Sequence, residues 1–574
     1  MPLVEGALEP RVVYPRADAL IATRDSNFIF GSIGHGLATL TIDGAPVRVL
    51  PNGSFIAFLP VPADSSYELV AALGADTARL SHPVRILPPR PALGDTAVLV
   101  VDSASVAPRG GLALRGDEPV RVSVRASPAA TAWVELGVDT ARVGRTPAPE
   151  LRRVLLLPGR RDSSTFAADL PARDLRAAAR VVVARGADTV RLPIARVDSV
   201  ATTPRLGILV ADTTAGAELP IVGRPVPGGT YKWFLLPGTV VELSGRSGAF
   251  FRVRLDSQLE IWVDSADVRA LPEGSAAPRR VLPNLRVVPD SAWVDVVMPL
   301  GERPAFLVQA HGRDLVLTLY GTTGNTDIIR YAANDSLVRT IEWTQETSDR
   351  ARLTVRLSSP VYGWHAMQDG ARFVLRIRRP PAVDAGAPLR GRLIVVDAGH
   401  PPAGATGPTG LYEAEPVLDV AERVRALLEA RGARVLMTRT TAEPVALYAR
   451  PEMARRANAD ALVSVHLNAL PDGVNPFTAQ GTGVYFFHPP SEPLARDVQR
   501  ELVRWLGLPN LGVYYDNLAL VRTPWMPSIL TEGLFIMMPE QEAAMRTALG
   551  REAYARGIAD GLEAYFRGLA SGRR

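Results

Sequence analysis

The last third of the chain contains the stretch Leu393-Ile394-Val395-Val396-Asp397-Ala398-Gly399-His400. Its first four residues form a short apolar run rich in β-branched side chains, which is typical of a buried parallel strand. Open α/β sheets bind ligands at the carboxyl ends of such strands, so Asp397 and His400 stand where a functional site is expected. The Gly- and Pro-rich stretch 401–410 that follows predicts a loop.

Strands and helices alternate from this point to the end of the chain. A helix is expected after Gly410, since apolar residues keep helical spacing from Val417 to Leu428 and Gly432 stops the helix. The other expected elements are strands at 433–438, 461–465, 483–487 and 527–531, and helices at 445–458, from Ser491 as N-cap, and at 539–567. This alternation predicts an α/β domain with a mostly parallel sheet flanked by helices.

Four residues with metal or acid–base chemistry lie at or just beyond the ends of these elements, namely His400, Glu413, His466 and Glu532. Two imidazoles and one carboxylate are a standard ligand set for catalytic zinc, and a further carboxylate can carry protons in hydrolysis. The four residues together therefore predict metal-assisted amide hydrolysis. Each alone has a structural explanation, because single histidines often pack in cores and a glutamate at a helix start interacts with the helix dipole.

The composition of the whole chain excludes several classes of protein. With 574 residues the chain is too long for one core, and 47% hydrophobic and 21% charged residues are ordinary for soluble globular protein. The net charge is +5, and the basic residues, with Lys232 the only lysine, are interleaved with acidic ones, which argues against nucleic-acid binding. Cysteine is absent, so a metal must be held by His, Asp or Glu. No apolar run reaches the roughly 18 residues of a membrane span.

Residues 393 to about 567 resemble the zinc-dependent N-acetylmuramoyl-L-alanine amidases of the Amidase_3 type. Four motifs, in the family's order, carry the resemblance: Val396-Asp397-Ala398-Gly399-His400, Gly410-Leu411-Tyr412-Glu413, Ser464-Val465-His466-Leu467-Asn468-Ala469 and Pro527-Ser528-Ile529-Leu530-Thr531-Glu532-Gly533-Leu534-Phe535. Thr438-Arg439 and the later Arg450 are similar to the family's connecting segment.

The resemblance implies that His400, Glu413 and His466 are zinc ligands and that Glu532 is the general base. The implied reaction is hydrolysis of the amide between N-acetylmuramic acid and L-alanine in peptidoglycan. Glu415 competes with Glu413 as a ligand, but alignment on Ala421 favours Glu413. The implied location is the cell envelope, periplasmic or secreted, although no signal peptide is visible at the start of this chain.

Two features depart from the family or vary within it. Pro401-Pro402 stands where the family usually has two glycines, which puts the shape of the loop beside the metal in question. The segment 470–481 is short, whereas some family members carry here a helical insertion that blocks the site until an activator binds. We therefore expect an enzyme that needs no activator protein.

His488 lies just after a strand and could touch substrate, but a structural role is favoured. No role is assigned to His35, His82, His311 and His365.

The chain up to about Pro381 has a β pattern, with short alternating runs and turn residues such as Asp43-Gly44. We expect these domains: a module that resembles immunoglobulin-like folds at 12–90, a β-sandwich-like module of unknown role at 91–200, an SH3-like module at 205–272, a module that resembles the AMIN domain at 284–380, and the zinc amidase domain at 391–570. A Pro-rich linker is expected at 379–388.

Three other interpretations remain open. The first is a non-catalytic cell-wall-binding scaffold or regulator with an amidase-like domain, although such domains usually lose a ligand or the base, and here all four positions are filled. The second is a zinc hydrolase of the same fold with another amide substrate. The third, a cytoplasmic enzyme, rests on the missing signal peptide alone.

Overall fold

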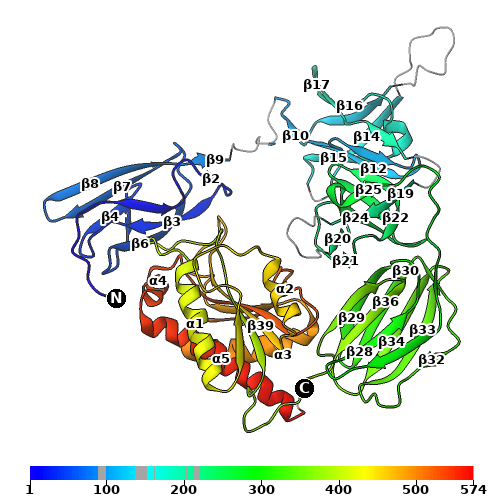
Figure 1. The fold of residues 1–574 in the computed structure, drawn as a ribbon. Coiled ribbons are helices and arrows are strands. Elements are labelled where there is room, and N and C mark those ends of the chain that lie inside the picture. Colours follow the sequence, from blue (N-terminus) through cyan, green and yellow to red (C-terminus); the bar gives the residue numbers. More distant parts are fainter. Residues whose placement is uncertain are drawn as a thin grey trace.

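We describe the protein from a computed structural model. The described residues are 1–87, 93, 98–137, 152–160, 162–200, 205–211 and 220–572. Several β-rich regions precede one α/β domain at the carboxyl end (Figure 1). The predicted fold class, all-β modules followed by a mostly parallel sheet flanked by helices, is confirmed. The predicted start of the second module, at residue 91, lies outside the described residues.

The α/β domain is built on a six-stranded sheet within the fully described range 393–572. Its strands, in spatial order, are β38 (Arg434–Met437), β37 (Leu393–Ala398), β39 (Ala461–Asn468), β42 (Ser528–Phe535), β40 (Thr482–Phe486) and β41 (Asn510–Tyr515). The first four are parallel, β40 is antiparallel to β42, and β41 is parallel to β40. The strands β37, β39 and β42 therefore end at the same edge of the sheet, which is where the candidate residues were expected to meet.

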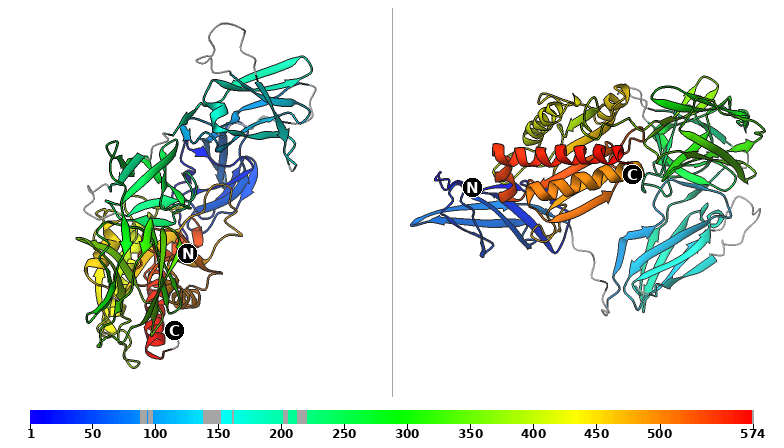
Figure 2. Two further views of the ribbon diagram at one scale, coloured as in Figure 1. Left: turned by 90° about the vertical axis from the view of Figure 1, so that its right-hand side faces the viewer. Right: turned by 90° about the horizontal axis from the view of Figure 1, so that it is seen from below.

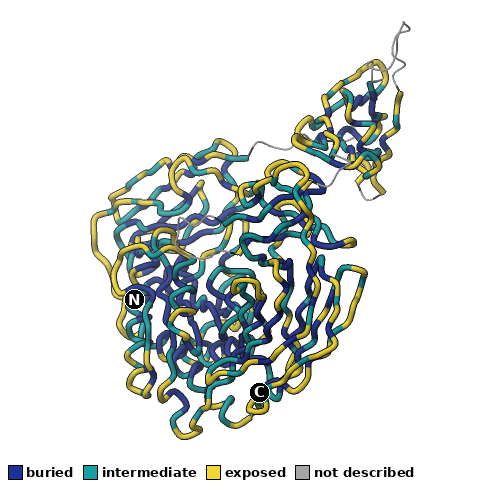
Figure 3. The backbone as a smooth tube through the Cα atoms, turned by 45° about the vertical axis from the view of Figure 1, so that its right-hand side comes forward, coloured by how far each residue is buried: buried dark blue, intermediate teal, exposed yellow. Residues whose placement is uncertain are grey.

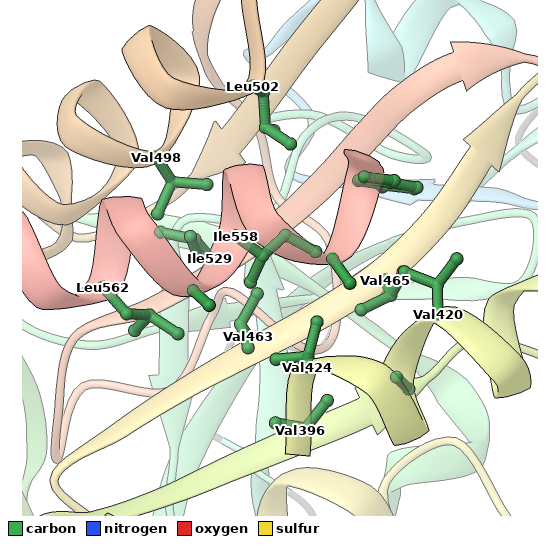
Figure 4. Packing of buried hydrophobic residues seen from close by; sticks show 14 of the residues in the cluster. Val396, Val420, Val424, Val463, Val465, Val498, Leu502, Ile529, Ile558 and Leu562 are labelled. Atoms are coloured by element: carbon green, nitrogen blue, oxygen red, sulfur yellow. The ribbon is translucent and has the colours of Figure 1, made fainter. Parts of the chain in front are cut away.

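Helices cover both faces of this sheet. They are α1 (Ala414–Ala430), α2 (Ala449–Arg456), α3 (Glu492–Leu506), α4 (Pro539–Met545) and α5 (Ala548–Ala570). Apolar residues of α1, α3 and α5 enclose the alternate strand residues Val396, Val463, Val465 and Ile529 in one continuous core (Figure 4). The opposite face carries Val395 and Leu462, which pack with Ala454 of α2 and with Met526. Because side chains alternate along a strand, Asp397, Ser464, His466 and Glu532 all belong to this second face.

The helices α3 and α5 run side by side over the first face (Figure 2). Glycine makes this contact possible, because a Cβ atom on Gly561 would lie 2.4 Å from the Cα atom of Val498. A substitution at Gly561 would therefore separate the two helices. The predicted stop of α1 is also confirmed, since α1 ends at Ala430 and Gly432 has a φ angle of +87°.

Several expected elements differ in detail. The predicted helix at 539–567 is interrupted between α4 and α5, because Thr547 takes an extended conformation and its side chain accepts a hydrogen bond from the amide of Gly550 as the cap of a new helix. Ser491 precedes α3 as predicted, but its hydroxyl group accepts a hydrogen bond from the amide of Ser528 instead of capping the helix. The strand β42 continues past Thr531, so Glu532 lies within it. The edge strand β41 was not predicted.

Residues 1–87 form the first β region. Its sheets consist of β1 (Arg11–Tyr14), β3 (Ser26–Ser32) and β6 (Ser54–Pro60); of β5 (Ala45–Val47), β4 (Thr39–Ile42), β7 (Ser66–Leu73) and β8 (Asp76–Pro83); and of β2 (Leu20–Ile21) with β9 (Arg85–Ile86). The hairpin predicted at Asp43-Gly44 is present, with φ angles of 51° and 78° at these residues.

The next two sheets are linked to each other. Within the described part of 98–200, one sheet contains β10 (Val101–Ala107), β12 (Pro119–Ala126), β15 (Thr165–Pro171), β14 (Arg152–Pro158), β13 (Thr131–Leu136), β16 (Ala179–Arg185) and β17 (Asp188–Pro193). The other contains β18 (Val197–Ser199), β11 (Leu112–Leu114), β22 (Val240–Ser247), β23 (Phe250–Arg254), β24 (Glu260–Asp264), β20 (Ile221–Arg224) and β21 (Trp233–Leu235), with β19 (Arg205–Leu209) and β25 (Val268–Ala270). Since β11 pairs with β22, the earlier segment contributes to the later sheet.

Residues 280–378 form the last β region, in which two larger sheets share one apolar core. In Figure 3, most buried residues of the protein lie in its interior and the exposed ones on its outer loops. One sheet has β32 (Ile329–Arg330), β27 (Leu285–Pro289), β28 (Trp293–Met298), β36 (Arg372–Arg378) and β35 (Trp364–Asp369). The other has β29 (Ala305–His311), β30 (Asp314–Tyr320), β34 (Arg350–Leu357) and β33 (Val338–Thr347), and β26 (Arg280–Leu282) pairs with β31 (Thr322–Gly324). Among the described residues, no helix is long and apolar enough to cross a membrane.

Three regions of β structure contact the α/β domain directly. The region that contains β21 does so through Phe234, whose ring lies edge-on to that of Phe487 with 6.0 Å between the centroids. From the last β region, the guanidinium group of Arg378 donates to the backbone carbonyl of Asn458 and to the carboxylate of Asp460, and the hydroxyl of Tyr362 donates to the carbonyl of Asp460. From the first region, Phe28 and Phe30 share a small apolar cluster with Phe535, Met537 and Met538. The α/β domain is therefore held by contacts with all three regions.

Candidate metal centre

Three side chains meet at the carboxyl edge of the sheet. His400 follows β37, Glu413 immediately precedes α1, and His466 lies near the end of β39. One potential ligand atom from each lies within 4.8 Å of the others. Nε2 of His400 is 3.2 Å from Oε2 of Glu413, and Nδ1 of His466 is 3.3 Å from Oε1 of the same carboxylate. The structure thus brings together the three residues for which a ligand role was predicted.

Glu413 is the most deeply buried of the three, with 2% of its surface exposed. Its Oε2 atom also accepts a hydrogen bond from the amide of Ala405, and Oε1 accepts one from the amide of Leu467. Burial alone would raise the pKa of Glu413, but the hydrogen bonds and charges of His400 and His466 outweigh it and lower that pKa to about 2. The carboxylate is therefore ionised and fixed in orientation, as a metal ligand must be.

The donor set fits zinc. A tetrahedral zinc ion at about 2.0–2.2 Å from nitrogen and oxygen ligands needs those ligand atoms about 3.3–3.5 Å apart. The nitrogen–oxygen distances of 3.2 and 3.3 Å in this cluster are close to that value. Both imidazole rings keep some exposure, 23% for His400 and 15% for His466, so substrate can approach from solvent.

Glu532 lies directly opposite His466 in the pairing of β39 with β42. Its Oε2 atom is buried, and none of the described residues offers that atom a hydrogen bond. Burial raises the pKa of Glu532 well above its ordinary value, and the negative charge of Glu413 adds to this effect. A carboxyl group of this kind, opposite a candidate metal ligand and with one buried oxygen that no described residue hydrogen-bonds, is suited to exchange a proton with a reacting group.

Two buried arginines support the loop that carries His400. Arg450 of α2 donates to the carboxylate of Asp397 and to the carbonyl oxygens of Ala398, His400 and Pro401. Arg439 donates to the carbonyl oxygens of Ala398, Gly399 and Ala414. Hydrogen bonds from these two arginines therefore hold the loop with Pro401-Pro402 in place.

Glu542 of α4 holds the second ligand loop and was missed by the sequence interpretation. Its carboxylate is fully buried and accepts hydrogen bonds from the amides of Thr409 and Leu411 and from the hydroxyl of Thr409. Arg546 contacts both Glu542 and Thr409. Thr409 and Leu411 lie in the loop just before Glu413. Since more than 130 positions separate Glu542 from Leu411, no local pattern could have indicated the contact.

The remaining candidates lie away from the cluster. Glu415, the competing ligand, is exposed to solvent on α1. His488 faces the last β region, where its ring packs edge-on against Trp364 at 4.9 Å and its Nε2 atom contacts the carbonyl of Arg522 at 2.8 Å. His82 is buried in the first β region against the carbonyl of Pro15. The favoured structural role for His488 agrees with this placement.

Comparison with known proteins identifies the domain. A profile of the N-acetylmuramoyl-L-alanine amidase family matches residues 394–564. The protein YqiI of Bacillus subtilis is 32% identical over 192 residues, which cover 88% of that protein and 32% of this chain. This chain belongs to the N-acetylmuramoyl-L-alanine amidase family. Its amidase domain contains all four residues that the resemblance singled out, and three of them form the candidate metal site.

Other relatives of this amidase domain include proteins of the cell wall. The probable cell wall amidase LytH of Staphylococcus epidermidis is 31% identical over 204 residues, 35% of this chain and 64% of that protein. The chain thus spans less than two thirds of the length of this relative. N-acetylmuramoyl-L-alanine amidase LytC of Bacillus subtilis is 32% identical over 179 residues, 30% of this chain and 35% of that protein. Among solved structures, amidase AmiC2 of Nostoc punctiforme is 31% identical with a TM-score of 0.29, covering 30% of this chain and 96% of that one.

Proposed function

We propose that the protein is a zinc-dependent N-acetylmuramoyl-L-alanine amidase that hydrolyses the amide between N-acetylmuramic acid and L-alanine in peptidoglycan. The observation that carries the proposal is the cluster of His400, Glu413 and His466 with Glu532 opposite His466 on the next strand. In this proposal His400, Glu413 and His466 hold the zinc ion and Glu532 is the general base. Membership of the amidase family supplies the substrate class.

The residues divide the reaction between them. Bound zinc supplies Lewis-acid polarisation of the scissile carbonyl and of the attacking water. Glu532 accepts a proton from that water as its oxygen bonds to the carbonyl carbon, and then delivers the proton to the leaving nitrogen of L-alanine as the carbon–nitrogen bond breaks. The raised pKa of Glu532 favours the second step, since the protonated carboxyl group must persist until the amine leaves.

The proposal extends to the β regions and to the location of the protein. We assign the region 12–90 to an immunoglobulin-like module, 91–200 to a β-sandwich-like module, 205–272 to an SH3-like module and 284–380 to an AMIN-like module, ahead of the amidase domain at 391–570. The two-sheet arrangement of residues 280–378 supports the fourth assignment. A wall substrate requires a position in the cell envelope, periplasmic or secreted.

We also propose that the enzyme acts without an activator protein. The segment 470–481 contains no α-helix, and its residues Asp472 and Gly473 hydrogen-bond to the first β region. No part of that segment takes a ligand position in the cluster of His400, Glu413 and His466. Full activity of the purified protein alone is the expected result, and activity that appears only after another protein is added would contradict it.

The test is release of sugar-free stem peptides from purified peptidoglycan by the full chain. The samples are wild type, wild type treated with a chelator, Glu532→Ala, and Glu415→Ala as a matched control at an exposed glutamate of α1. Release by wild type and by the control alone, with new L-alanine amino termini, supports the proposal. Zinc binding without release in any sample favours a wall-binding scaffold or a different amide substrate.

A further inference from the structure

Two tyrosines extend the face of the sheet that carries Glu532 toward its outer edge. In the pairing of β42 with β40, Glu532 lies opposite Gly483, and in the pairing of β40 with β41, Tyr485 lies opposite Tyr514. Directly opposed residues project to the same face, as do residues two apart on a strand. Glu532, Gly483, Tyr485 and Tyr514 therefore share the face on which His466 lies.

The two tyrosine rings form a flat surface, which we call the tyrosine shelf (Tyr485 and Tyr514). The rings are stacked, with centroids 5.1 Å apart and planes 21° apart. The ring of Tyr514 leans over Gly483, since a Cβ atom on Gly483 would lie 3.2 Å from Cε2 of that ring. The shelf therefore reaches back from the edge strand to the residue opposite Glu532.

The shelf is open to solvent on its outer side. Tyr514 is 38% exposed although it is a large aromatic side chain, whereas Tyr485 is half-buried beneath it. The side chain of Asn468, two residues after His466, hydrogen-bonds to Tyr485. The shelf is thus fixed in orientation at its inner end and accessible at its outer end, as a binding surface beside a reaction centre should be.

The charges around the shelf indicate what it binds. Burial raises the pKa of Tyr485 to about 12, and the nearby acidic groups of Glu532 and Asp516 add to this effect. The stem peptide of peptidoglycan carries carboxylates, which the negative charge of Asp516 repels. An N-acetylated sugar ring carries no charge, and its apolar C–H face can stack on an aromatic ring.

We propose that the tyrosine shelf binds an amino-sugar ring of the glycan strand, on the carbonyl side of the scissile amide. This proposal rests on the proposed amidase function and names the part of the substrate that Tyr485 and Tyr514 contact. Tyr514 acts as a binding residue that sets the apparent affinity for glycan and takes no part in proton transfer.

The neighbouring residue Tyr515 provides a matched control. It lies on the same edge strand and is more exposed, at 68%, but its ring stacks on Phe487 and takes no part in the stack of Tyr485 with Tyr514. We expect Tyr514→Ala to raise the KM for a soluble disaccharide-peptide substrate about fivefold to tenfold, with kcat changed less than twofold, because stacking contributes roughly 1 kcal/mol. We expect Tyr515→Ala to match wild type.

A binding measurement separates this proposal from the proposed reaction. The probe is a peptide-free N-acetylglucosamine tetramer, titrated calorimetrically into the full-chain wild type, Tyr514→Ala and Tyr515→Ala, with a free stem peptide as the second probe. Weaker binding of the tetramer to Tyr514→Ala alone supports the proposal even if wild type releases no stem peptide. Unchanged tetramer binding, or a loss confined to the stem peptide, overturns it. Tyr514→Thr, which keeps a β-forming residue on the edge strand, replaces the alanine variant if that variant unfolds.

Discussion

The hydroxyl group of Tyr14, on β1, donates a 2.5 Å hydrogen bond to Oδ1 of Asp472, 458 positions later in the chain. Asp472 follows the strand that carries His466, and it also accepts hydrogen bonds from the amide of Ala22 and from the side chain of Asn27. One carboxylate of the amidase domain thus satisfies three donors of the first β region. This contact joins the amino-terminal strands to a loop that leaves the candidate metal centre.

Asp472→Ala should loosen the first β region from the amidase domain. The substitution leaves the three donors without their acceptor, and we expect it to lower the free energy of unfolding by about 1–3 kcal/mol. Urea denaturation measures this, and amide hydrogen exchange in β1 and β3 should increase. Asp76→Ala, at an exposed hairpin turn, is the control. Equal stability of the two variants would show that the contact of Asp472 with the first β region does not stabilise the protein.

Arg450→Lys should weaken zinc binding although Arg450 is not a ligand. Arginine contacts the Asp397 carboxylate and the carbonyl oxygens of the His400 loop simultaneously, and lysine cannot reproduce this planar fork. Loss of such supporting contacts costs about 10-fold to 100-fold in metal affinity. Competition with a chromophoric chelator measures the change. Arg456, which pairs with Glu452 on the same helix, is exposed, so Arg456→Lys should leave the zinc affinity unchanged. A similar loss of zinc affinity in both variants would contradict the supporting role of Arg450.

Glu542→Gln should affect both stability and the metal site. The amide group of glutamine keeps one acceptor oxygen but loses the other, while the amides of Thr409 and Leu411 and the Thr409 hydroxyl still require acceptors. We expect a loss of about 1–3 kcal/mol in unfolding free energy and weaker zinc binding, because the loop leads directly to Glu413. Glu540→Gln, half-exposed on the same helix, is the control. An unchanged zinc affinity in Glu542→Gln would limit its role to stability.

The free energy of unfolding should decrease in mild acid because of two histidines at the contact between the last β region and the α/β domain. Burial lowers the pKa of His365 and of His488 to about 4. The unfolded chain takes up a proton at each below about pH 6.5, whereas the folded chain does so near pH 4. The free energy of unfolding should therefore fall between pH 6.5 and 4, by about 1 kcal/mol per pH unit for each histidine, and level off below that range.

Denaturation of His488→Gln and His365→Gln at pH 7.5, 6 and 5 tests this pH dependence. Each variant should show a smaller loss between pH 6.5 and 4 than wild type, since one titrating group has been removed. The exposed His311 provides the control, and His311→Gln should follow the wild-type curve. Parallel curves for all three variants would mean that other groups cause the decrease.

The amidase domain was largely predictable from local patterns. The apolar run before His400, the helical spacing after Glu413 and the strand before His466 each depend on residues a few positions apart, so they can be read along the chain. The edge strand β41 was missed because Tyr514 and Tyr515 interrupt an alternating pattern, and its pairing partner lies about 30 residues earlier. The break before α5 was missed because helical spacing continues across Thr547, and the side chain of that residue decides the new start.

The sequence by itself determined which chemical groups this protein can use: two imidazoles and two carboxylates at element ends, with no thiol to compete for a metal. It also determined the order of most strands and helices in the amidase domain, because hydrophobic spacing is a local property. Only the tertiary structure decided the contacts that orient those groups, such as Glu542 with Thr409, Arg450 with the His400 loop, and Tyr14 with Asp472. Such contacts depend on how far-separated segments pack, and hydrogen-bond geometry between them leaves no periodic signal in the chain.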